Sequence, residues 1–481
     1  MKEELRKDFV EHTTPYANRR TSILIEERKQ DPKSYWMLLL YMLFISSYGY
    51  NVLYVQPIAR SMKKAFDVKD SDLSILLSVG SISSSVFFLP LIYVVVMRGV
   101  KVACLVGLGL LTIGTFLELF IDQSWALIYI GHTITHAGSP VFNIANAKFA
   151  SIWFNPKTRP LAITLNAMMS TVGILMAFLI PGLFVNANSN LTPEGVQSQV
   201  KNFYYFLLAL YGTLFILCLV FFQEAPARYI TYRQEEAAIR MNFKMFSQIW
   251  ELVQEPTYIY FVVVIGVGVA SVMINQLLIV QLMSPYQFSQ NTCQIAGAIM
   301  VLGGVVGSIG YTKLLIQKPN QLRKLKILYM LILMAYTVFS YLPTFKKTYL
   351  LFIACFTLGF FGMTQVSIAI ESLIKYIIIT GPQRIVIGSG VVQVILSMAN
   401  GAFSFILRDF LMENSPEGVA KINITIFCTL TIAFILSLAL QVSFERRINA
   451  IVKKSDVPSL LPALTIKTKD YLVASLAANK D

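Results

Sequence analysis

The chain has 481 residues, a formal net charge of +14, 56% hydrophobic residues and only 14% charged residues. A soluble domain carries about 25% charged residues, so this composition excludes an ordinary globular protein and indicates a chain that faces lipid. The basic residues are distributed over many loops rather than gathered on one face, which argues against nucleic acid as a partner. Five widely spaced cysteines inside apolar stretches predict neither a disulfide nor a structural zinc site.

Twelve apolar stretches follow one another along the chain, and each is long enough to cross a bilayer. A transmembrane helix needs about 20 mostly apolar residues, and its backbone must be hydrogen-bonded internally in lipid. The sequence therefore predicts an all-α membrane protein with twelve transmembrane helices, at residues 35–58, 72–96, 101–121, 125–150, 160–185, 203–223, 257–283, 292–316, 325–343, 348–378, 383–411 and 420–443.

The longest internal connection follows the sixth helix and divides the chain into two sets of six. Ile239, Phe243, Phe246 and Trp250 lie at helical spacing in this connection, which predicts an amphipathic helix over 234–250 along the membrane surface. Short basic connections enter both the third and the ninth helix, as expected for a duplicated six-helix unit. The predicted domains are a polar amino-terminal tail (1–34), a six-helix lobe (35–223), a connection (224–256), a second six-helix lobe (257–443) and a polar carboxy-terminal tail (444–481).

The basic residues also predict an orientation. About 31 of the 40 Lys and Arg residues fall on the side of the membrane that the two tails share, and such residues are enriched on the cytoplasmic side. We therefore expect both termini in the cytosol or in an organelle matrix. The plasma membrane and the mitochondrial inner membrane are both compatible with this pattern.

Two short segments resemble signatures of a known family. They are Ala-Ser-Ile-Trp-Phe-Asn-Pro-Lys at 150–157 and Phe-Gln-Glu-Ala-Pro at 222–226, with a weaker similarity at 362–390. They resemble the feline leukaemia virus subgroup C receptor family, a branch of the major facilitator superfamily associated with choline, ethanolamine and haem transport. The resemblance implies two six-helix lobes with a substrate pathway between them.

The sequence also departs from that family. The loop between the second and third helices keeps Arg98, Gly99 and Lys101, and the resemblance implies contacts between the lobes there, but Met97 lies near the position of the usual acidic residue. Tyr50 and Tyr54 are the nearest candidates for the family's pathway tryptophan, whose ring suits a quaternary ammonium group. These departures count in favour of an alternative interpretation. In it, the chain is a transporter-like subunit of a larger complex that has lost its transport activity.

Ionisable residues inside a membrane span are costly and are candidates for function. Glu371 and Lys375 lie four residues apart on the tenth helix, so they can pair along one face. One interpretation is a pair that neutralises itself, with Lys375 reaching toward the membrane interface. The other is a coupling role, for which Glu371 is the best candidate in the sequence.

His132 and His136 share one face of the fourth helix. Such a pair can relay protons, or bind a metal if a third ligand converges. No carboxylate or cysteine lies on the same helical face, so hydrogen bonds between helices are favoured and no metal site is predicted. With several uncharged polar residues in other spans, the pair completes the predicted substrate pathway, which consists of Tyr50, Asn51, Tyr54, His132, His136, Asn143, Asn166, Asn275, Gln276, Glu371, Gln393 and Asn400.

Two functions remain from the sequence. The first is a secondary transporter of a small solute that works by alternating access, with a water-accessible cavity touched by Tyr50, Tyr54, His136, Asn275 and Glu371. The second is an accessory subunit that binds other subunits of a membrane complex through both tails. No nucleophile elbow, phosphate loop or pair of carboxylates is present in a span, so we expect neither enzymatic activity nor a cofactor.

Overall fold

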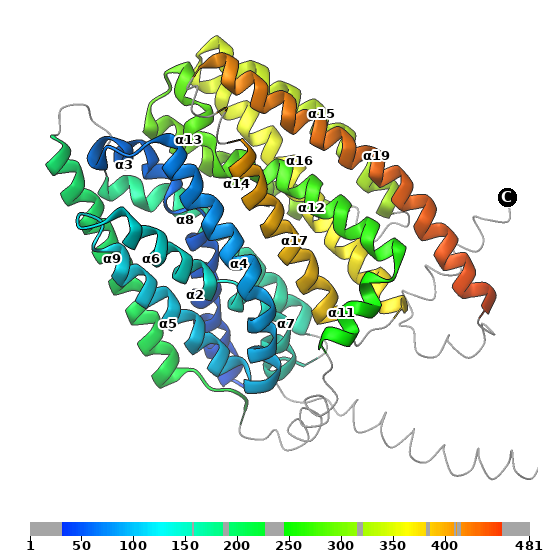
Figure 1. Ribbon diagram of the computed structural model, residues 1–481. Helices are drawn as coiled ribbons and strands as arrows, with labels where there is room; N and C mark the ends of the chain where they lie inside the picture. Colours follow the sequence, from blue (N-terminus) through cyan, green and yellow to red (C-terminus); the bar gives the residue numbers. More distant parts are fainter. Residues whose placement is uncertain are drawn as a thin grey trace, which may run out of the picture.

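The computed structural model describes residues 31–155, 158–185, 192–226, 245–314, 321–380, 385–407, 410 and 415–454, and within these ranges it contains helices and no strand. The long helices lie side by side in one bundle (Figure 1). The amino-terminal half, as we define it, consists of α2 (Lys33–Leu53), η1 (Gln56–Ile58), α3 (Ala59–Phe66), α4 (Asp70–Arg98), α5 (Val100–Glu118), α6 (Trp125–Gly138), α7 (Val141–Trp153), α8 (Arg159–Phe184) and α9 (Pro193–Phe221).

The second half of the chain repeats this arrangement of long helices joined by short connections. It follows a surface helix, α11 (Met245–Val253), and is called the carboxy-terminal half below. Its elements are α12 (Pro256–Leu277), α13 (Ile279–Leu282), η2 (Ser284–Tyr286), α14 (Gln290–Leu314), α15 (Gln321–Tyr341), η3 (Leu342–Phe345), α16 (Thr348–Thr380), α17 (Ile385–Ile406) and α19 (Pro416–Lys454).

Ten helices of the described ranges are long and apolar enough to cross a membrane. The fourth predicted crossing is divided into α6 and α7 at Pro140, because proline lacks the backbone N–H that a continuous helix requires. The eleventh is α17, of which Gly390–Ile406 forms a shorter apolar helix. The prediction of an all-α membrane protein is therefore confirmed, whereas twelve unbroken crossings are not.

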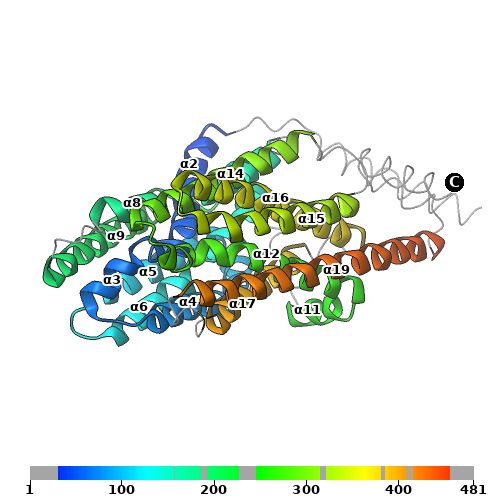
Figure 2. The same ribbon diagram turned by 90° about the horizontal axis from the view of Figure 1, so that it is seen from above.

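The helices of each half pack mainly on one another. In the amino-terminal half α2 packs on α8 and α5 on α6, and in the carboxy-terminal half α14 packs on α16 and α12 on α19. The two groups lie next to each other when the bundle is seen from above (Figure 2) and meet along two helix pairs, α4 with α17 and α8 with α14. A pathway between the halves would therefore lie between these two seams.

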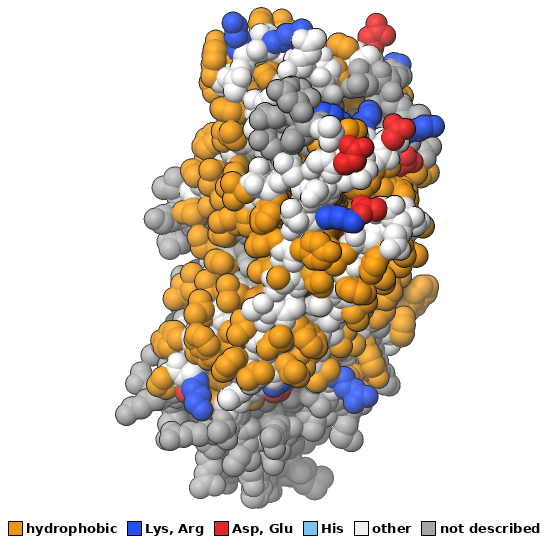
Figure 3. Space-filling model, turned by 90° about the vertical axis from the view of Figure 1, so that its left-hand side faces the viewer, with side chains coloured by type: hydrophobic (Ala, Val, Ile, Leu, Met, Phe, Trp, Pro, Cys, Tyr) orange, Lys and Arg blue, Asp and Glu red, His pale blue; other side chains and the backbone are white. Residues whose placement is uncertain are grey.

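The start of the first helix and the end of the last helix distinguish the two ends of the bundle. Helix α2 begins and α19 ends at the same end, which we call the tail side, and the opposite end is called the far side (Figure 1). The space-filling view shows broad apolar surface between the ends, with Lys and Arg side chains near both (Figure 3). This distribution matches a protein whose middle faces hydrocarbon and whose ends face water.

Helix α11 lies at the tail side and packs on α17 and α12. Phe246 is 75% exposed and Trp250 is 65% exposed, whereas Leu252 is buried. The helix therefore has one apolar face against the bundle and a second, exposed apolar face. The part of the predicted amphipathic helix before Met245 lies outside the described residues.

Candidate functional site

A buried carboxyl group lies inside the amino-terminal half. Glu118, the last residue of α5, is fully buried, and its Oε1 atom accepts a hydrogen bond of 2.6 Å from the Tyr54 hydroxyl. The Nδ1 atom of His132 lies 3.1 Å from the same hydroxyl and 3.4 Å from Oε1 of Glu118. The end of α2, α5 and α6 thus bring a phenol, an acid and an imidazole together. We call Tyr54, Glu118 and His132 the buried triad.

Small residues allow this close approach. Helices α5 and α6 cross where Gly114 lies against Gly131, and a methyl group on Gly131 would be 2.8 Å from Cγ of Glu118. Gly80 of α4 makes room for the imidazoles, since a methyl group there would lie 2.9 Å from Nε2 of His132 and 3.0 Å from Nε2 of His136. Glycine at these positions therefore lets α4, α5 and α6 pack around the buried triad.

His136 extends the site along α6. Its ring centroid lies 4.3 Å from that of His132, and the hydroxyl of Ser84 lies 3.4 Å from its Nδ1 atom. The predicted face of two histidines is therefore present. The sequence analysis predicted no carboxylate beside these histidines. The structure has one, because Glu118 of the neighbouring helix α5 lies next to His132.

Further hydroxyl groups surround the buried triad without a hydrogen-bond partner among the described residues. They belong to Tyr50 on α2, Thr115 on α5, and Tyr204 and Tyr211 on α9, and the Oε2 atom of Glu118 also has no partner. Burying a polar group without a partner costs about 1–3 kcal/mol in proteins. Such groups are therefore candidates for binding a proton, water or a ligand.

A second polar cluster joins the two halves at the far side. Gln56 donates to Oε1 of Gln281 over 2.7 Å, and Arg60 donates to the carbonyl oxygens of Phe288 and Val280 over 2.5 and 3.0 Å. Two more bonds complete it, from Ser61 to Oε1 of Gln290 over 3.2 Å and from Gln294 to the carbonyl oxygen of Pro57 over 2.9 Å. We call these five hydrogen bonds, whose residues come from η1 and α3 on one side and from the segment 280–294 on the other, the far-side latch.

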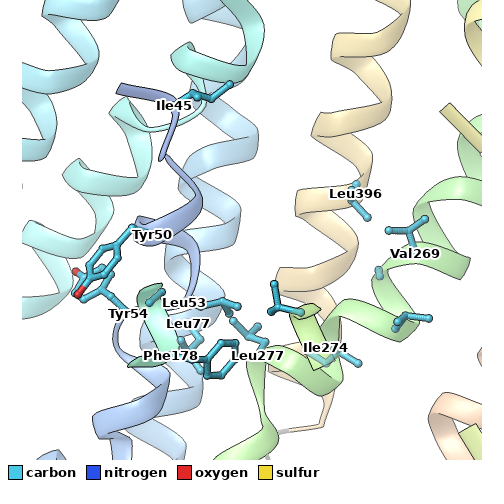
Figure 4. Close-up of a cluster of buried hydrophobic side chains, with 14 of the residues drawn as sticks. Ile45, Tyr50, Leu53, Tyr54, Leu77, Phe178, Val269, Ile274, Leu277 and Leu396 are labelled. Carbon is cyan, nitrogen blue, oxygen red and sulfur yellow. The ribbon is translucent and has the colours of Figure 1, made fainter. Parts of the chain in front are cut away.

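Apolar side chains fill the space between the halves near the latch. Leu53, Leu77 and Phe178 from the amino-terminal half lie near Leu277 and Ile274 of α12, and all five are buried (Figure 4). Tyr50 and Tyr54 extend from the opposite side of α2, toward the interior of their own half (Figure 4). The buried triad is therefore separated from the carboxy-terminal half by α2.

The structure distributes the other residues of the predicted pathway over several places. Asn166 donates to Oδ1 of Asn146 over 2.8 Å, and Asn143 is hydrogen-bonded to Tyr48. Asn51 is 1% exposed and neither atom of its amide group has a hydrogen-bond partner. Within the carboxy-terminal half, Asn275 and Gln276 are buried on α12, whereas Gln393 and Asn400 are half-buried on α17.

The predicted coupling pair, Glu371 and Lys375, lies on α16, but the side chains of these two residues are outside the part of the chain that the structure describes. Tyr50, Tyr54, His136 and Asn275 are at most 6% exposed. They do not line an open cavity in this conformation, contrary to expectation, because they are enclosed by helices of their own halves.

The loop with Arg98, Gly99 and Lys101 contacts its own half. Gly99 adopts a φ of +93°, and the Glu224 carboxylate accepts hydrogen bonds from the backbone N–H groups of Val100 over 2.8 Å and Lys101 over 2.6 Å. A carboxylate at this position stabilises the amino-terminal end of α5 through its free N–H groups. Within the described residues the loop thus ties α5 to the end of α9, rather than one half to the other.

Sequence reasoning missed Glu118, Arg60 and the glutamines of the latch. Glu118 lies near the end of a predicted span and on a different helix from the histidines, so the pattern along the histidines' helix does not reveal it. Gln56 and Arg60 lie at the end of the first span, where polar residues are usual. A search for every acidic residue within one turn of a span end would have found Glu118.

No group of three or more His, Cys, Asp or Glu residues suited to a metal ion occurs in the described ranges.

A sequence model described as the Major Facilitator Superfamily matches residues 39–404. The chain is 22% identical over 303 residues to the choline/ethanolamine transporter flvcr2b of Danio rerio, which covers 60% of this chain and 61% of that protein. It is 21% identical over 467 residues to the choline/ethanolamine transporter FLVCR1 of Mus musculus, covering 92% of this chain and 82% of that one.

Solved structures show the same fold. A bacterial homologue of the human lysosomal transporter Spinster superposes with a TM-score of 0.66 at 15% identity, covering 87% of this chain and 99% of the other. The D-xylose-proton symporter superposes with a TM-score of 0.61 at 12% identity, covering 83% of this chain and 96% of the other. The predicted two-lobed arrangement of helices is thereby confirmed.

Proposed function

The chain belongs to the major facilitator superfamily, and on this premise we propose that it is a secondary transporter that moves a small solute by alternating access between its two halves. The observation that carries the proposal is the far-side latch. At the far side it joins the halves through hydrogen bonds of neutral side chains, one arginine and backbone carbonyl groups. Such contacts can be broken and remade with each transport cycle.

The latch is weak enough to be reversible. A hydrogen bond contributes about 0.5–1.5 kcal/mol net, so five of them supply a few kcal/mol. A ligand shifts an equilibrium of this size when it binds one conformation more tightly than the other by a similar amount. Solute binding between the halves is therefore able to open or close the latch.

Three amide side chains, of which Asn51 and Gln276 are buried and Asn400 is half-buried, form the proposed solute site. Asn51 on α2 lacks partners for both amide atoms, and on the other side Gln276 and Asn400 each have one amide atom without a partner in the described part of the chain. These residues lie on helices of different halves. A small solute with hydrogen-bonding groups would satisfy them and contact both halves at once.

The distribution of basic residues and the position of the latch support an orientation of the protein in the membrane. Because basic residues are enriched at the tail side, this side would face the cytosol or a matrix, and the latch would close the opposite face of the membrane. The structure would then correspond to a state closed toward the non-cytosolic side. An accessory-subunit function gains no support from the named relatives, which are transporters.

The test is uptake of labelled solute by purified protein in proteoliposomes, with choline and ethanolamine as first probes because relatives are named for them. Asn51→Leu should lower the initial rate by about tenfold or more, since it removes hydrogen bonds to the solute worth about 1.4 kcal/mol or more. The thermal stability of this variant should stay the same or rise, because the amide group that the substitution removes has no hydrogen-bond partner among the described residues.

Asn146→Leu is the matched control, since Asn146 pairs with Asn166 and with the carbonyl oxygen of Ile163. That substitution should lower thermal stability. The proposal for Asn51 is wrong if Asn51→Leu destabilises the protein as much as Asn146→Leu while the transport rate per folded molecule is unchanged. Transport itself is contradicted if protein-containing vesicles take up neither probe faster than empty vesicles.

A further inference from the structure

We propose that Glu118 and His132 form a proton-binding pair that couples transport to a proton gradient, and that Tyr54 passes the protonation state of this pair to the far-side latch. This inference rests on the proposed transport function and names its coupling ion. It differs from the sequence-based expectation, which placed coupling at Glu371. The inference depends on the distances within the buried triad, on the absence of a Lys or Arg contact to Glu118 among the described residues, and on the position of Tyr54 in the chain.

The surroundings of Glu118 contain no Lys or Arg contact in the described part of the chain. The titratable groups that face it are Tyr54 just after α2, His132 on α6, and Tyr204 and Tyr211 on α9. Helix α4 contributes Gly80 and Ser84 beside the histidines, and the ring of His136 lies next to that of His132. A carboxylate buried here without a cation would be costly, so the site favours taking up a proton when it is closed to water.

The hydrogen bonds define where protons can reside. The Tyr54 hydroxyl has one proton, which it donates to Oε1 of Glu118 over 2.6 Å. His132 then donates from Nδ1 to the Tyr54 oxygen, a tautomer that we assign from this network. Two atoms without partners remain, Oε2 of Glu118 and Nε2 of His132. A proton on either atom changes the pair from a net charge of −1 to neutral, and it can move between them without changing that charge.

Hydroxyl groups surround the pair on the α9 side and toward α2. Tyr204 and Tyr211 interact electrostatically with Glu118, and Tyr50 interacts with Tyr211. None of these three hydroxyls has a hydrogen-bond partner in the described part of the chain. Any water that enters the site can therefore hydrogen-bond to these hydroxyls and connect Glu118 to Tyr50.

Tyr54 connects this pair to the latch through the backbone. It lies immediately after α2, and the latch residues Gln56 and Pro57 follow it by two and three positions. When Glu118 is a carboxylate, the Tyr54 hydroxyl donates to it and holds this turn of chain. Protonation of Glu118 weakens that charge-assisted bond and so changes the support for the latch. Proton binding and latch opening are thereby linked, as coupled transport requires.

The first test detects the proton directly and does not depend on the solute. Infrared difference spectra of proteoliposomes across a pH titration should show the C=O stretch of a buried carboxylic acid. Glu118→Gln should remove this band, and Tyr54→Phe should keep it but shift its frequency and midpoint. Glu194→Gln, at an exposed carboxyl group at the start of α9, is the control and should leave the band unchanged. The proton site is wrong if the band is absent from the wild type or persists in Glu118→Gln.

The second test measures coupling, with the membrane potential clamped at zero. If one proton accompanies each solute, an imposed gradient of about one pH unit supports about tenfold accumulation of labelled choline or ethanolamine. Glu118→Gln should abolish this accumulation while exchange of labelled solute at equal pH continues. Accumulation by Glu118→Gln equal to that of the wild type would overturn coupling at this pair. A titrating band without any solute exchange would leave the proton site in place and contradict the transport function instead.

Discussion

Covalent locking of the far-side latch is expected to stop solute uptake. Cysteines at Gln56 and Gln281, whose amide groups are hydrogen-bonded over 2.7 Å, can be joined by a short bifunctional thiol reagent that leaves reducible bonds. The hydrogen bonds of the latch together contribute a few kcal/mol and can break in each cycle, whereas a covalent bridge cannot. Uptake by the cross-linked double variant should fall by about tenfold or more and return after reduction.

The controls for this experiment are the two single variants and the native chain. The five native cysteines lie within the bundle, and four of them are buried. The reagent should therefore leave uptake by the three control proteins unchanged. Unimpaired uptake by a double variant that is fully cross-linked would show that the far side need not open.

Substitution of Gly173 by alanine is expected to cause a large loss of stability. Helices α2 and α8 cross where Gly173 lies against the carbonyl oxygen of Ser46 and Gly49 lies against that of Ser170. The added methyl group would overlap the backbone of α2, which cannot move aside as a flexible side chain can. Overpacking of this kind costs about 1–3 kcal/mol or more, so the thermal midpoint of the detergent-purified protein should fall by several degrees.

Gly212→Ala is the matched control, because a methyl group at that helical position meets nothing within 4 Å. It should leave the midpoint unchanged or raise it slightly, since alanine favours helix over glycine. Gly49→Ala should resemble Gly173→Ala, and the double variant should lose less than the sum of the two, because both act at one crossing. Equal midpoints for Gly173→Ala and Gly212→Ala would contradict the close packing of α2 on α8.

Hydrophobicity and helix length predicted most of the fold, because a lipid environment imposes both along the chain itself. The spans and the single long connection are local properties of this kind. The length of the fourth span led to the prediction of one continuous helix over 125–150. Gly138, Ser139 and Pro140 interrupt this span, and the structure breaks it there into α6 and α7. Span length alone therefore does not guarantee an unbroken helix.

The site was less predictable, because its contacts join helices that are distant in sequence. Helical periodicity places His132 and His136 on one face, but it does not identify α5 as the helix that this face meets. Glu118 reaches the histidines only because Gly114 and Gly131 bring α5 and α6 together. The latch likewise depends on the pairing of η1 and α3 with residues more than 200 positions later. Such pairings follow from tertiary packing and have no signal within one span.

Alternating access can be tested most directly by distances between spin labels on the two halves, measured by double electron–electron resonance in lipid. One pair, at Arg98 and Gln254, reports on the tail side, and the other, at Gln123 and Lys347, reports on the far side; all four residues are exposed. The account predicts opposite changes when pH or solute is varied, so that one distance lengthens as the other shortens. Distances that stay constant at both ends under every condition would contradict it.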